Sequence, residues 1–596
     1  MTIEKRISIE VVSILAEISA ARLDPDDVHL QKTRKEFEGD LTLVVFPFVK
    51  HFRKSPEETA GLLGTKLVER LEEVVTFNVV KGFLNLGLSD DFWLDFLSNK
   101  LQTGIIAEEK APSEPVVVEF SSPNTNKPLH LGHIRNNLLG YSISQILEAD
   151  GHQVIKVNLV NDRGIHICKS MLAWMRFGEG ATPEATGKKG DKLVGDYYVL
   201  FETKLREQID QLMKERGMGE EEARKAAPLM QEAQDLLRRW EARDTEVISV
   251  WEKMNGWVYD GFEETYARMG VSFDKIYYES DTYLLGRDIV LSGVESGVLE
   301  KKADGSIWAD LSEYKLDPKL LLRPDGTSVY MTQDIGTAAL RYGDYVPVQM
   351  IYVVGNEQNH HFNVLKKVIG KLGKPYADAI FHLSYGMVEL PEGKMKSREG
   401  KVVDADDLMD EMIETARRTT EELGKTNDFS EDEKERLYYI IGLGALKYFI
   451  LKVDPRKNML FNPAESIDFN GNTGPFIQYT HARICSVLRS AGEYNVKNAT
   501  ASIGKAGLSD KEKRLLKTLY EYPSVVSEAA REMSPAQIAN YVYELAKGFN
   551  QFYHEHSILN DPDPVQRSFR LCLSDLTSRT IKNGMALLGI EVPERM

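Results

Sequence analysis

Apolar positions in the first hundred residues follow a helical spacing and then an extended one. The segment RISIEVVSILAEISA (6–20) places its apolar residues on one helical face. LTLVVFPFV (41–49) and VVKGFLNLGLS (79–89) have the composition of strands, with a helix expected between them. The proline-flanked stretch EEKAPSEP (108–115) has the composition of a linker. We therefore predict a small N-terminal α/β unit over residues 1–110.

A second pattern begins at VVVEF (116–120), a short apolar run typical of a buried parallel strand. A long helical pattern (131–151) and the strand candidate QVIKVNLVND (153–162) follow it, which makes a βαβ unit. This order predicts an α/β fold with a doubly wound, Rossmann-type sheet over residues 111–430. Charged helical segments indicate a mostly helical insertion at about 170–280. Strand candidates return at DKIYYES, SIWADL, MIYVVG and AIFHLSYG.

From about residue 430 onward the pattern is almost entirely helical, and we predict an all-α domain over 431–596. At roughly 100–200 residues per domain, three or four units suit a chain of 596 residues. Hydrophobic residues make up 42% of the chain, enough for each unit to bury a core.

Charge and cysteine content indicate which partners and which metal or disulfide sites to expect. The net charge of -17 argues weakly against a nucleic-acid partner, although a local basic surface can sit on an acidic protein. The three cysteines lie far apart without a CxxC pair, so neither a disulfide framework nor a cysteine zinc site is expected. There is no signal-peptide core and no apolar run near the roughly 20 residues that span a bilayer. These features predict a soluble, cytoplasmic protein that makes no membrane contact.

Two histidines follow the strand candidate VVVEF, in EFSSPNTNKPLHLGHIRNN. Pro128 suits the first turn of a helix, where His130 and His133 then share one face. Gly132 leaves room for a ligand to approach the backbone. A helix N-terminus favours phosphate, and imidazoles there can donate hydrogen bonds to its oxygens. The alternative is a structural or zinc-binding pair, but zinc needs a third ligand and no HExxH or CxxC accompanies them.

A cation-rich segment, GMVELPEGKMKSREGK (386–401), lies well downstream. Lys394, Lys396 and Arg398 are suited to close over a triphosphate and stabilise charge in transfer. The alternative is an ordinary exposed basic loop, which would be the better interpretation of KMKSR alone. Its combination with the HxGH helix favours an ATP site.

Together these elements resemble the HIGH and KMSKS signatures of class I aminoacyl-tRNA synthetases. The longer string SPNTNKPLHLGHIRN (122–136) resembles that of the arginyl enzymes. NDRG (161–164), LLLRPDGTSVYMTQDIGTA (320–338), GNEQNHHF (355–362) and GPFIQYTHARI (474–484) fit the same family. The resemblance covers the whole chain.

The resemblance implies ATP-dependent activation of L-arginine, followed by its transfer to the 3′ end of tRNA(Arg). It also implies a monomer, and a need for bound tRNA before activation. We expect Mg²⁺ to accompany ATP, held mainly by the phosphates, because the sequence shows no acidic metal-binding cluster. No protein metal site is predicted.

One residue departs from the wider class. The second lysine of KMSKS is replaced by Ser397. In arginyl enzymes a lysine just before the HIGH segment is thought to substitute, and Lys127 matches it. Lys396, displaced by one position, is the alternative, and the sequence does not decide between them.

Selection of arginine requires a desolvated acid, because guanidinium is planar and always charged. By resemblance, the arginine-contacting positions are Glu119, Ser121, Asn124, Tyr330, Asp334 and Gln358. Tyr330 and Asp334 are expected to read the guanidinium, while Glu119 and Asn124 hold the α-amino group and backbone. An acid at the end of the apolar VVVEF also calls for a cationic partner. The alternatives are a helix-capping role for Asp334 and a core position for Tyr330.

The resemblance also implies tRNA contacts outside the catalytic unit. Phe83 and Asn85 are candidates for an unstacked base at the tRNA elbow. Tyr479, His481 and Arg483 are candidates in an anticodon-binding bundle, and the ending that includes Met596 reaches the anticodon loop. The alternatives are a strand aromatic and turn asparagine in the first set, and a core tyrosine in the second.

Two rival functions remain at this level. Another class I synthetase is disfavoured by the missing cysteine zinc ligands and by a length too short for a large editing domain. A non-catalytic tRNA-binding paralogue is disfavoured because both ATP-binding segments are intact.

Overall fold

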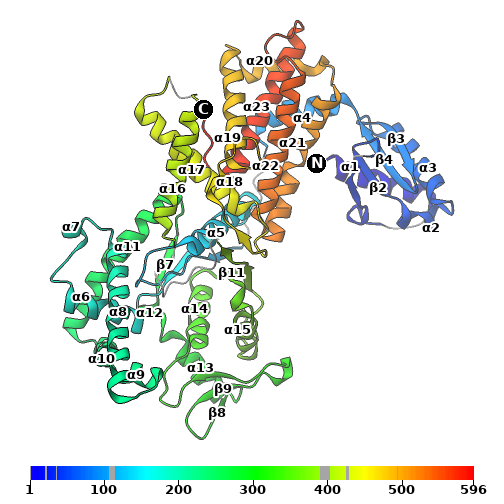
Figure 1. Cartoon of the computed structure of the whole chain (residues 1–596). Coiled ribbons are helices and arrows are strands. Elements are labelled where there is room, and N and C mark those ends of the chain that lie inside the picture. The colour runs from blue at the N-terminus through cyan, green and yellow to red at the C-terminus, as the bar shows by residue number, and fades with distance from the viewer. Residues whose placement is uncertain are drawn as a thin grey trace.

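The fold is described from a computed structural model that covers residues 2–19, 23–34, 36–105, 114–389, 403–424, 428–492 and 494–596. The N-terminal sheet lies at one side of the molecule, the parallel sheet with its insertion below, and a helical bundle above (Figure 1). Helix α5 (Leu131–Ala149) runs between the parallel sheet and the bundle.

The N-terminal unit is an antiparallel four-stranded sheet of order β1-β2-β4-β3 with helices around it. Where the sequence suggested one strand over 79–89, the chain forms a hairpin. Lys81 and Gly82 both adopt positive φ, 49° and 78°, which suits a two-residue turn whose twist matches the strands. Its elements are α1 (Ile3–Ile18), β1 (Leu30–Lys32), β2 (Leu41–Val44), α2 (Val49–Phe52), α3 (Pro56–Arg70), β3 (Val74–Val80), β4 (Phe83–Leu88) and α4 (Asp90–Thr103).

The catalytic sheet has five parallel strands in the order β12-β11-β5-β6-β7. Its first strand in the sequence therefore lies at the centre, and the strand order reverses between β5 and β11. In open parallel sheets the ligand crevice lies at the carboxyl ends of the strands beside such a reversal. The strands are β5 (Val116–Glu119), β6 (Val154–Val160), β7 (Lys275–Tyr278), β11 (Gln349–Gly355) and β12 (Ile380–Tyr385).

Helices fill the connections of this sheet, and the expected helical insertion lies between β6 and β7. The strand expected at 306–311 belongs instead to a separate antiparallel sheet of β8 (Glu300–Lys301), β9 (Ile307–Ala309) and β10 (Lys319–Leu322). The helices are α6 (Ile165–Phe177), α7 (Pro183–Thr186), α8 (Gly190–Arg216), α9 (Glu220–Ala226), α10 (Pro228–Glu241), α11 (Thr245–Met269), α12 (Glu279–Thr282), α13 (Leu285–Glu295), α14 (Tyr330–Tyr345) and α15 (Asn359–Lys371).

The C-terminal part is helical, as the sequence predicts, apart from a short strand pair that joins it to the catalytic unit. In that pair, β13 (Val388–Glu389) and β14 (Met459–Leu460) run parallel. The helices are α16 (Ala405–Glu422), α17 (Glu431–Leu451), α18 (Pro463–Ser466), α19 (Gly474–Ser490), α20 (Val496–Thr500), α21 (Asp510–Glu532), α22 (Pro535–Glu555) and α23 (Pro564–Leu587).

The N-terminal unit contacts several helices of the bundle, including α21 and α23. Tyr520 packs edge-on against Trp93 and Phe96 of α4, with ring centroids 5.8 and 5.2 Å apart. Lys513 pairs with Asp90 at 2.7 Å. Aromatic burial supplies most of the stability of such a contact, and an exposed ion pair adds little.

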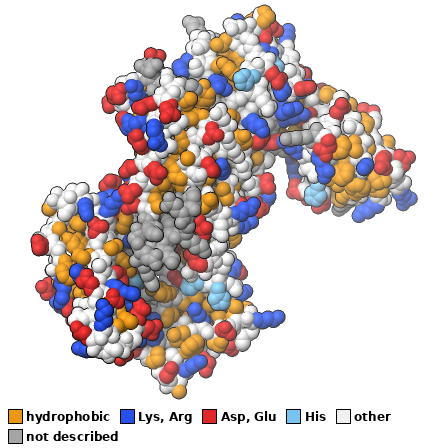
Figure 2. All heavy atoms as spheres, in the orientation of Figure 1, with side chains coloured by type: hydrophobic (Ala, Val, Ile, Leu, Met, Phe, Trp, Pro, Cys, Tyr) orange, Lys and Arg blue, Asp and Glu red, His pale blue; other side chains and the backbone are white. Residues whose placement is uncertain are grey.

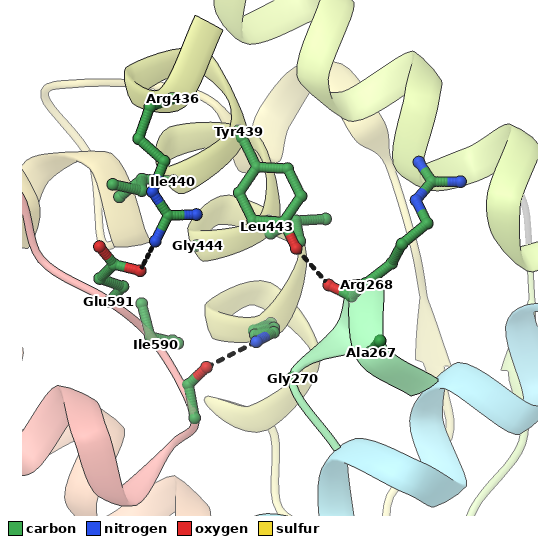
Figure 3. Close-up of a pocket in the computed structure, with 12 residues that line it drawn as sticks. Ala267, Arg268, Gly270, Arg436, Tyr439, Ile440, Leu443, Gly444, Ile590 and Glu591 are labelled. Atoms are coloured by element: carbon green, nitrogen blue, oxygen red, sulfur yellow. Dashed lines mark hydrogen bonds and ion pairs between the residues drawn. The ribbon is translucent and has the colours of Figure 1, made fainter. Parts of the chain in front are cut away.

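A cavity of about 280 Å³ lies where α11, α17 and the chain after α23 meet (Figure 3). Tyr439 donates a hydrogen bond to the carbonyl of Arg268 at 2.6 Å, and Arg436 pairs with Glu591 at 2.5 Å. Lys447 donates to the carbonyl of Gly589 at 2.6 Å, and burial lowers the pKa of its ammonium to about 8. None of the candidate site residues that the structure describes lines this cavity, which we interpret as a junction between the parallel-sheet unit and the bundle.

The surface in Figure 2 mixes charges of both signs. Lysine and arginine side chains are interspersed with acidic ones over the visible face, so the net charge does not create a uniformly acidic surface there. None of the described helices is long and apolar enough to cross a bilayer.

Candidate active site

Helix α5 begins at Leu131, with His130 as its N-cap. The expectation that Pro128 lies in the first helical turn is wrong, because the chain is still extended there. The two histidines cap the helix reciprocally. The Gly132 amide donates to Nδ1 of His130 (3.1 Å), and the His130 amide donates to Nδ1 of His133 (3.2 Å). Since both Nδ1 atoms accept, each neutral ring carries its proton on Nε2.

The pair is electrically neutral near pH 7. Burial, with Lys127 nearby, lowers the pKa of His130 to about 4. Burial also places the pKa of His133 well below its usual range, with smaller contributions from His130 and Lys127. A side chain on Gly132 would approach the His130 ring within 2.9 Å, so glycine preserves this arrangement. The rings are 4.0 Å apart between centroids and form a compact pair of Nε2 donors.

Lys127 precedes this pair and is half-buried. Burial lowers the pKa of its ammonium. Helix α8 packs closely here, since a Cβ on Gly195 would lie 2.9 Å from the Pro128 ring. Lys127 thus brings a partly desolvated ammonium to the start of α5, where negative charge is already favoured.

The candidates Lys394, Lys396 and Ser397 lie outside the described residues, as does the whole stretch 390–402. The chain on either side is attached near the histidine pair. The Leu131 amide donates to the carbonyl of Val403 (3.2 Å), and the Ala405 amide donates to that of Leu129 (2.9 Å).

The other flank is held by the buried guanidinium of Arg135, on α5. Its nitrogens donate to the carbonyls of Met387 (3.0 Å), Pro455 (3.1 Å) and Lys457 (2.7 Å). Both ends of the basic segment are therefore fixed to the HxGH region. Arg135 was not singled out from the sequence, because an arginine in a helical pattern indicates exposed surface.

The turn after β5 is sharp. Ser121 and Ser122 adopt positive φ, 78° and 47°, an unusual conformation for residues other than glycine. Asn136 of α5 stabilises it, accepting a hydrogen bond from the Ser121 amide (2.5 Å) and donating to the carbonyl of Val353 (2.7 Å). The Ser121 hydroxyl is hydrogen-bonded to that of Tyr266 (2.7 Å). This network holds the carboxyl ends of β5 and β11 together.

Glu119 has the cationic partner that its position required, and that partner is Arg341. The Glu119 carboxylate is ion-paired with the Arg341 guanidinium of α14 and accepts from the Ser122 hydroxyl (3.0 Å). Glu119 is 7% exposed and Arg341 only 1%. The pair keeps the pKa of Arg341 above its usual value despite burial. The sequence does not reveal Arg341 as this partner, because the two residues lie far apart along the chain.

Tyr330 and Asp334 lie one turn apart at the start of α14. Tyr330 is 79% exposed, so the alternative of a core tyrosine is wrong. The N-cap is Val329, so the alternative that Asp334 caps the helix is wrong as well. The Asp334 carboxylate instead meets Nε2 of His361 on α15 at 2.5 Å. An exposed aromatic ring and a partly exposed acid thus lie one turn apart on the same helix.

Asn124 and Gln358 are both exposed. Asn124 forms a bridge with Asn161 beyond the end of β6, and Gln358 is the last residue before α15. Both follow the carboxyl ends of strands, as do Glu119 and the HxGH turn. The candidates for arginine and ATP binding that lie within the described residues are therefore found near the carboxyl ends of the parallel strands.

In the N-terminal unit, Phe83 lies at the start of β4 and packs edge-on against the exposed Phe46 (5.5 Å). Asn85 lies within the strand and not in a turn. It is 2% exposed and accepts a hydrogen bond from the Thr42 hydroxyl (2.6 Å). Within the described part of the chain its Nδ2 has no hydrogen-bond partner.

In the bundle, Arg483 lies over the ring of Tyr479 (4.8 Å) and hydrogen-bonds with Asn550. His481 is buried, and its Nδ1 donates to the carbonyl of Pro593 (2.9 Å). The hydrogen bond from His481 thus attaches the C-terminal segment, which ends at Met596, to α19. Arg489 attaches the same segment through the carbonyl of Glu594 (3.0 Å).

A buried ion network that the sequence did not reveal joins the helical insertion to α16. Asp406 pairs with Lys189 (2.6 Å) and with Arg268 (2.9 Å). The cations hold the pKa of Asp406 below its usual value, although burial opposes them. Asp406 follows directly on the segment bonded to Leu129 and Leu131. The network therefore fixes the insertion relative to the HxGH turn.

Among the described residues, no third ligand joins the two histidines. Across the residues that the structure describes, no group of three His, Cys, Asp or Glu side chains is placed to hold a metal ion. Zinc binding by this pair, the alternative left open by the sequence, receives no support from the geometry.

Comparisons with known proteins agree with this arrangement. Residues 95–462 match the family model described as tRNA synthetases class I (R), catalytic domain, and residues 477–596 match the DALR anticodon binding domain. An arginine–tRNA ligase of Parabacteroides distasonis is 57% identical over 600 residues, covering 100% of both chains. One of Bacteroides fragilis is 56% identical with the same coverage. The solved arginyl-tRNA synthetase of Thermus thermophilus superposes with a TM-score of 0.79 at 25% identity, covering 100% of both chains.

Proposed function

Because this chain belongs to the arginyl-tRNA synthetases of class I, we propose specific roles for the residues at the carboxyl edge of its catalytic sheet. The chain joins L-arginine to the 3′ end of tRNA(Arg) in an ATP-dependent reaction. The observation that carries the proposal is the pair of Nε2 donors at the start of α5, beside the reversal of strand order. This is where a parallel sheet and a helix N-terminus together favour a nucleotide.

In the first step, a carboxylate oxygen of arginine attacks the α-phosphorus of ATP, and pyrophosphate leaves. Negative charge moves onto the phosphate oxygens as the bond to the β-phosphate breaks. We assign His130 and His133 to donate hydrogen bonds to these oxygens from Nε2. Both imidazoles are neutral, so each donates from Nε2 without carrying a positive charge of its own. The N-terminus of α5 adds a positive potential. Gly132 permits the close approach of the triphosphate.

In the second step, a hydroxyl at the 3′ end of tRNA attacks the carbonyl carbon of the adenylate, and AMP leaves. Neither step requires a covalent intermediate with a side chain, so the work of the protein is positioning and charge stabilisation. Lys394, Lys396 and Ser397 are proposed to complete the ATP site. Mg²⁺ is proposed to enter with ATP and to be held mainly by its phosphates.

Ser397 stands where the second KMSKS lysine would be, and Lys127 is proposed to supply the positive charge of that lysine. Replacing Lys127 with alanine is expected to slow single-turnover activation by about tenfold or more, because an ammonium beside the transferring phosphate is lost. Lys396→Ala serves as the matched comparison and is expected to have a smaller effect. The assignment fails if only Lys396→Ala is slow.

The arginine pocket is proposed to lie between the HxGH turn and the start of α14. Asp334 would pair with the guanidinium, with the ring of Tyr330 packed beside it. Glu119, Ser121 and Asn124 would surround the α-amino group. Glu119 is already paired with Arg341, and Ser121 with Tyr266, so each would act on the substrate together with that partner. Gln358 would contact the substrate from the turn before α15. An exposed aromatic ring beside an acid suits a planar cation.

The charge of Asp334 is tested by the nearly isosteric Asp334→Asn. A hydrogen bond to a charged group contributes about 1.5–3 kcal/mol, so arginine activation is expected to fall at least about tenfold. Activation of citrulline, which is neutral at that position, is expected to lose much less. The measurement is amino-acid-dependent pyrophosphate exchange with tRNA present and ATP fixed.

The matched control is Asp344→Asn on the same helix. Asp344 accepts a hydrogen bond from Tyr277 (2.8 Å) and has no proposed contact with substrate. Equal losses for arginine and citrulline in Asp334→Asn would make its role structural. Unchanged arginine activation would shift guanidinium recognition to Glu119.

The side chains proposed to contact tRNA differ in exposure, since Phe46 is exposed and Asn85 is only 2% exposed. Phe83, with Phe46, would stack on an unpaired base, and the free Nδ2 of Asn85 would donate to it. Tyr479 and Arg483 would meet the anticodon loop, while His481 would hold the segment that ends at Met596 in place. We further propose that the enzyme is a monomer and acts in the cytoplasm. Size-exclusion chromatography with light scattering and cell fractionation test these two proposals.

A further inference from the structure

The contact between Asp334 and His361 joins α14, which leads into β11, to α15, which follows β11. Nε2 of His361 lies 2.5 Å from Oδ2 of Asp334. A carboxylate only accepts hydrogen bonds, so the imidazole must donate, and Nε2 carries a proton in either charge state. A charge-assisted bond of this kind fixes the orientation of a carboxylate that would otherwise rotate.

The His361 ring is itself held in place by packing against the sheet. The next residue, Phe362, contacts it edge-on (5.7 Å) and stacks on the imidazole of His382 (4.4 Å). His382, on β12, donates from Nε2 to the carbonyl of Val354 on β11 (3.0 Å). A continuous set of contacts therefore runs from the two strands to the carboxylate of Asp334.

Asp334 remains accessible although one of its oxygens is engaged. Its side chain is 36% exposed and that of His361 is 22% exposed. The described residues provide no hydrogen bond to Oδ1. The bond to His361 thus holds Oδ2 on the α15 side and leaves the rest of the carboxylate for a planar donor.

We propose that His361 is a positioning residue for arginine: it orients the Asp334 carboxylate so that the guanidinium meets an acceptor already in place. The proposal rests on the proposed function, in which Asp334 binds the guanidinium. An acceptor that is already oriented stabilises the bound arginine and the transition state equally. Its loss should therefore raise the KM for arginine and leave kcat nearly unchanged.

The test uses the full-length enzyme with tRNA and measures the KM values for arginine and ATP, together with kcat. His361→Leu removes the donor, and its KM for arginine is expected to rise about tenfold while the KM for ATP stays within about twofold. His361→Gln retains an N–H donor and is expected to recover most of the affinity. His152→Leu is the matched control, since His152 also faces an aspartate, Asp150 (3.7 Å), beyond the far end of α5.

A double-mutant cycle shows whether His361 acts through Asp334. In the Asp334→Asn background, His361→Leu is expected to raise the KM for arginine by less than about twofold further. A rise in the KM for arginine with Asp334→Asn but not with His361→Leu would overturn the positioning role and keep the proposed function. No change with Asp334→Asn would overturn the guanidinium assignment itself. Additive effects, or equal losses of arginine and ATP affinity in a folded His361→Leu variant, would also overturn the positioning role.

Discussion

Alanine in place of His130 or His133 is expected to slow arginyl-adenylate formation by about a hundredfold or more. Each substitution removes one Nε2 donor from the start of α5, where charge accumulates on the leaving phosphates. The pair is reciprocal, because each ring also accepts an amide of the helix start. Pyrophosphate exchange measures the loss, and tRNA binding is expected to stay within about twofold.

A second variant separates catalysis from capping. Asparagine is among the best N-cap residues, and alanine at an N-cap costs about 1 kcal/mol. His130→Asn should therefore keep the helix start intact and still lack a donor with the reach of Nε2. We expect it to be as stable as the parent and as slow as His130→Ala. Exchange at the parent rate in either alanine variant would remove the histidines from the phosphate site.

Glu119→Gln is expected to cost about 3–5 kcal/mol of stability, because it leaves the guanidinium of Arg341 buried without a counter-charge. Arg341 is 1% exposed, so water cannot replace the lost carboxylate. The chain has several units and need not unfold in one step, so the observable is the urea midpoint of the transition that reports on the catalytic sheet.

The paired variant Glu119→Gln with Arg341→Met removes both charges. It is expected to recover a large part of the midpoint, since a buried ion pair and an apolar replacement are often of similar stability. An unchanged midpoint in Glu119→Gln alone would contradict the buried-pair account. A loss of activity in Glu119→Gln reports on arginine contacts only if it persists in the paired variant.

The elements that depend on local hydrophobic pattern could be predicted from the sequence. VVVEF predicted a buried parallel strand and the pattern after it a long helix, because a short apolar run between turns is typical of such a strand and a longer periodic run of a helix. The two-residue turn at Lys81–Gly82 was missed, although a lysine and a glycine at the tip of an apolar run permit it. The helix start was placed too early because Pro128 suggested a first turn, whereas the chain begins the helix at the histidine cap.

The features that escaped the sequence depend on contacts between distant segments. Arg341, Arg135 and His361 are polar residues on helices. Arg135 and His361 lie within quoted motifs, but a motif does not show which partner a side chain binds. Their roles arise from partners between 27 and 322 residues away. The proposed recognition of arginine therefore combines residues found by motif with supporting residues that only the fold reveals.

The central claim, that this site activates arginine, is tested most directly by tRNA-dependent pyrophosphate exchange with each amino acid in turn. The account predicts ATP–pyrophosphate exchange with arginine when tRNA(Arg) is present, and little with lysine, whose ammonium lacks the planar fork. Exchange with a different amino acid, or none with arginine under these conditions, would contradict it.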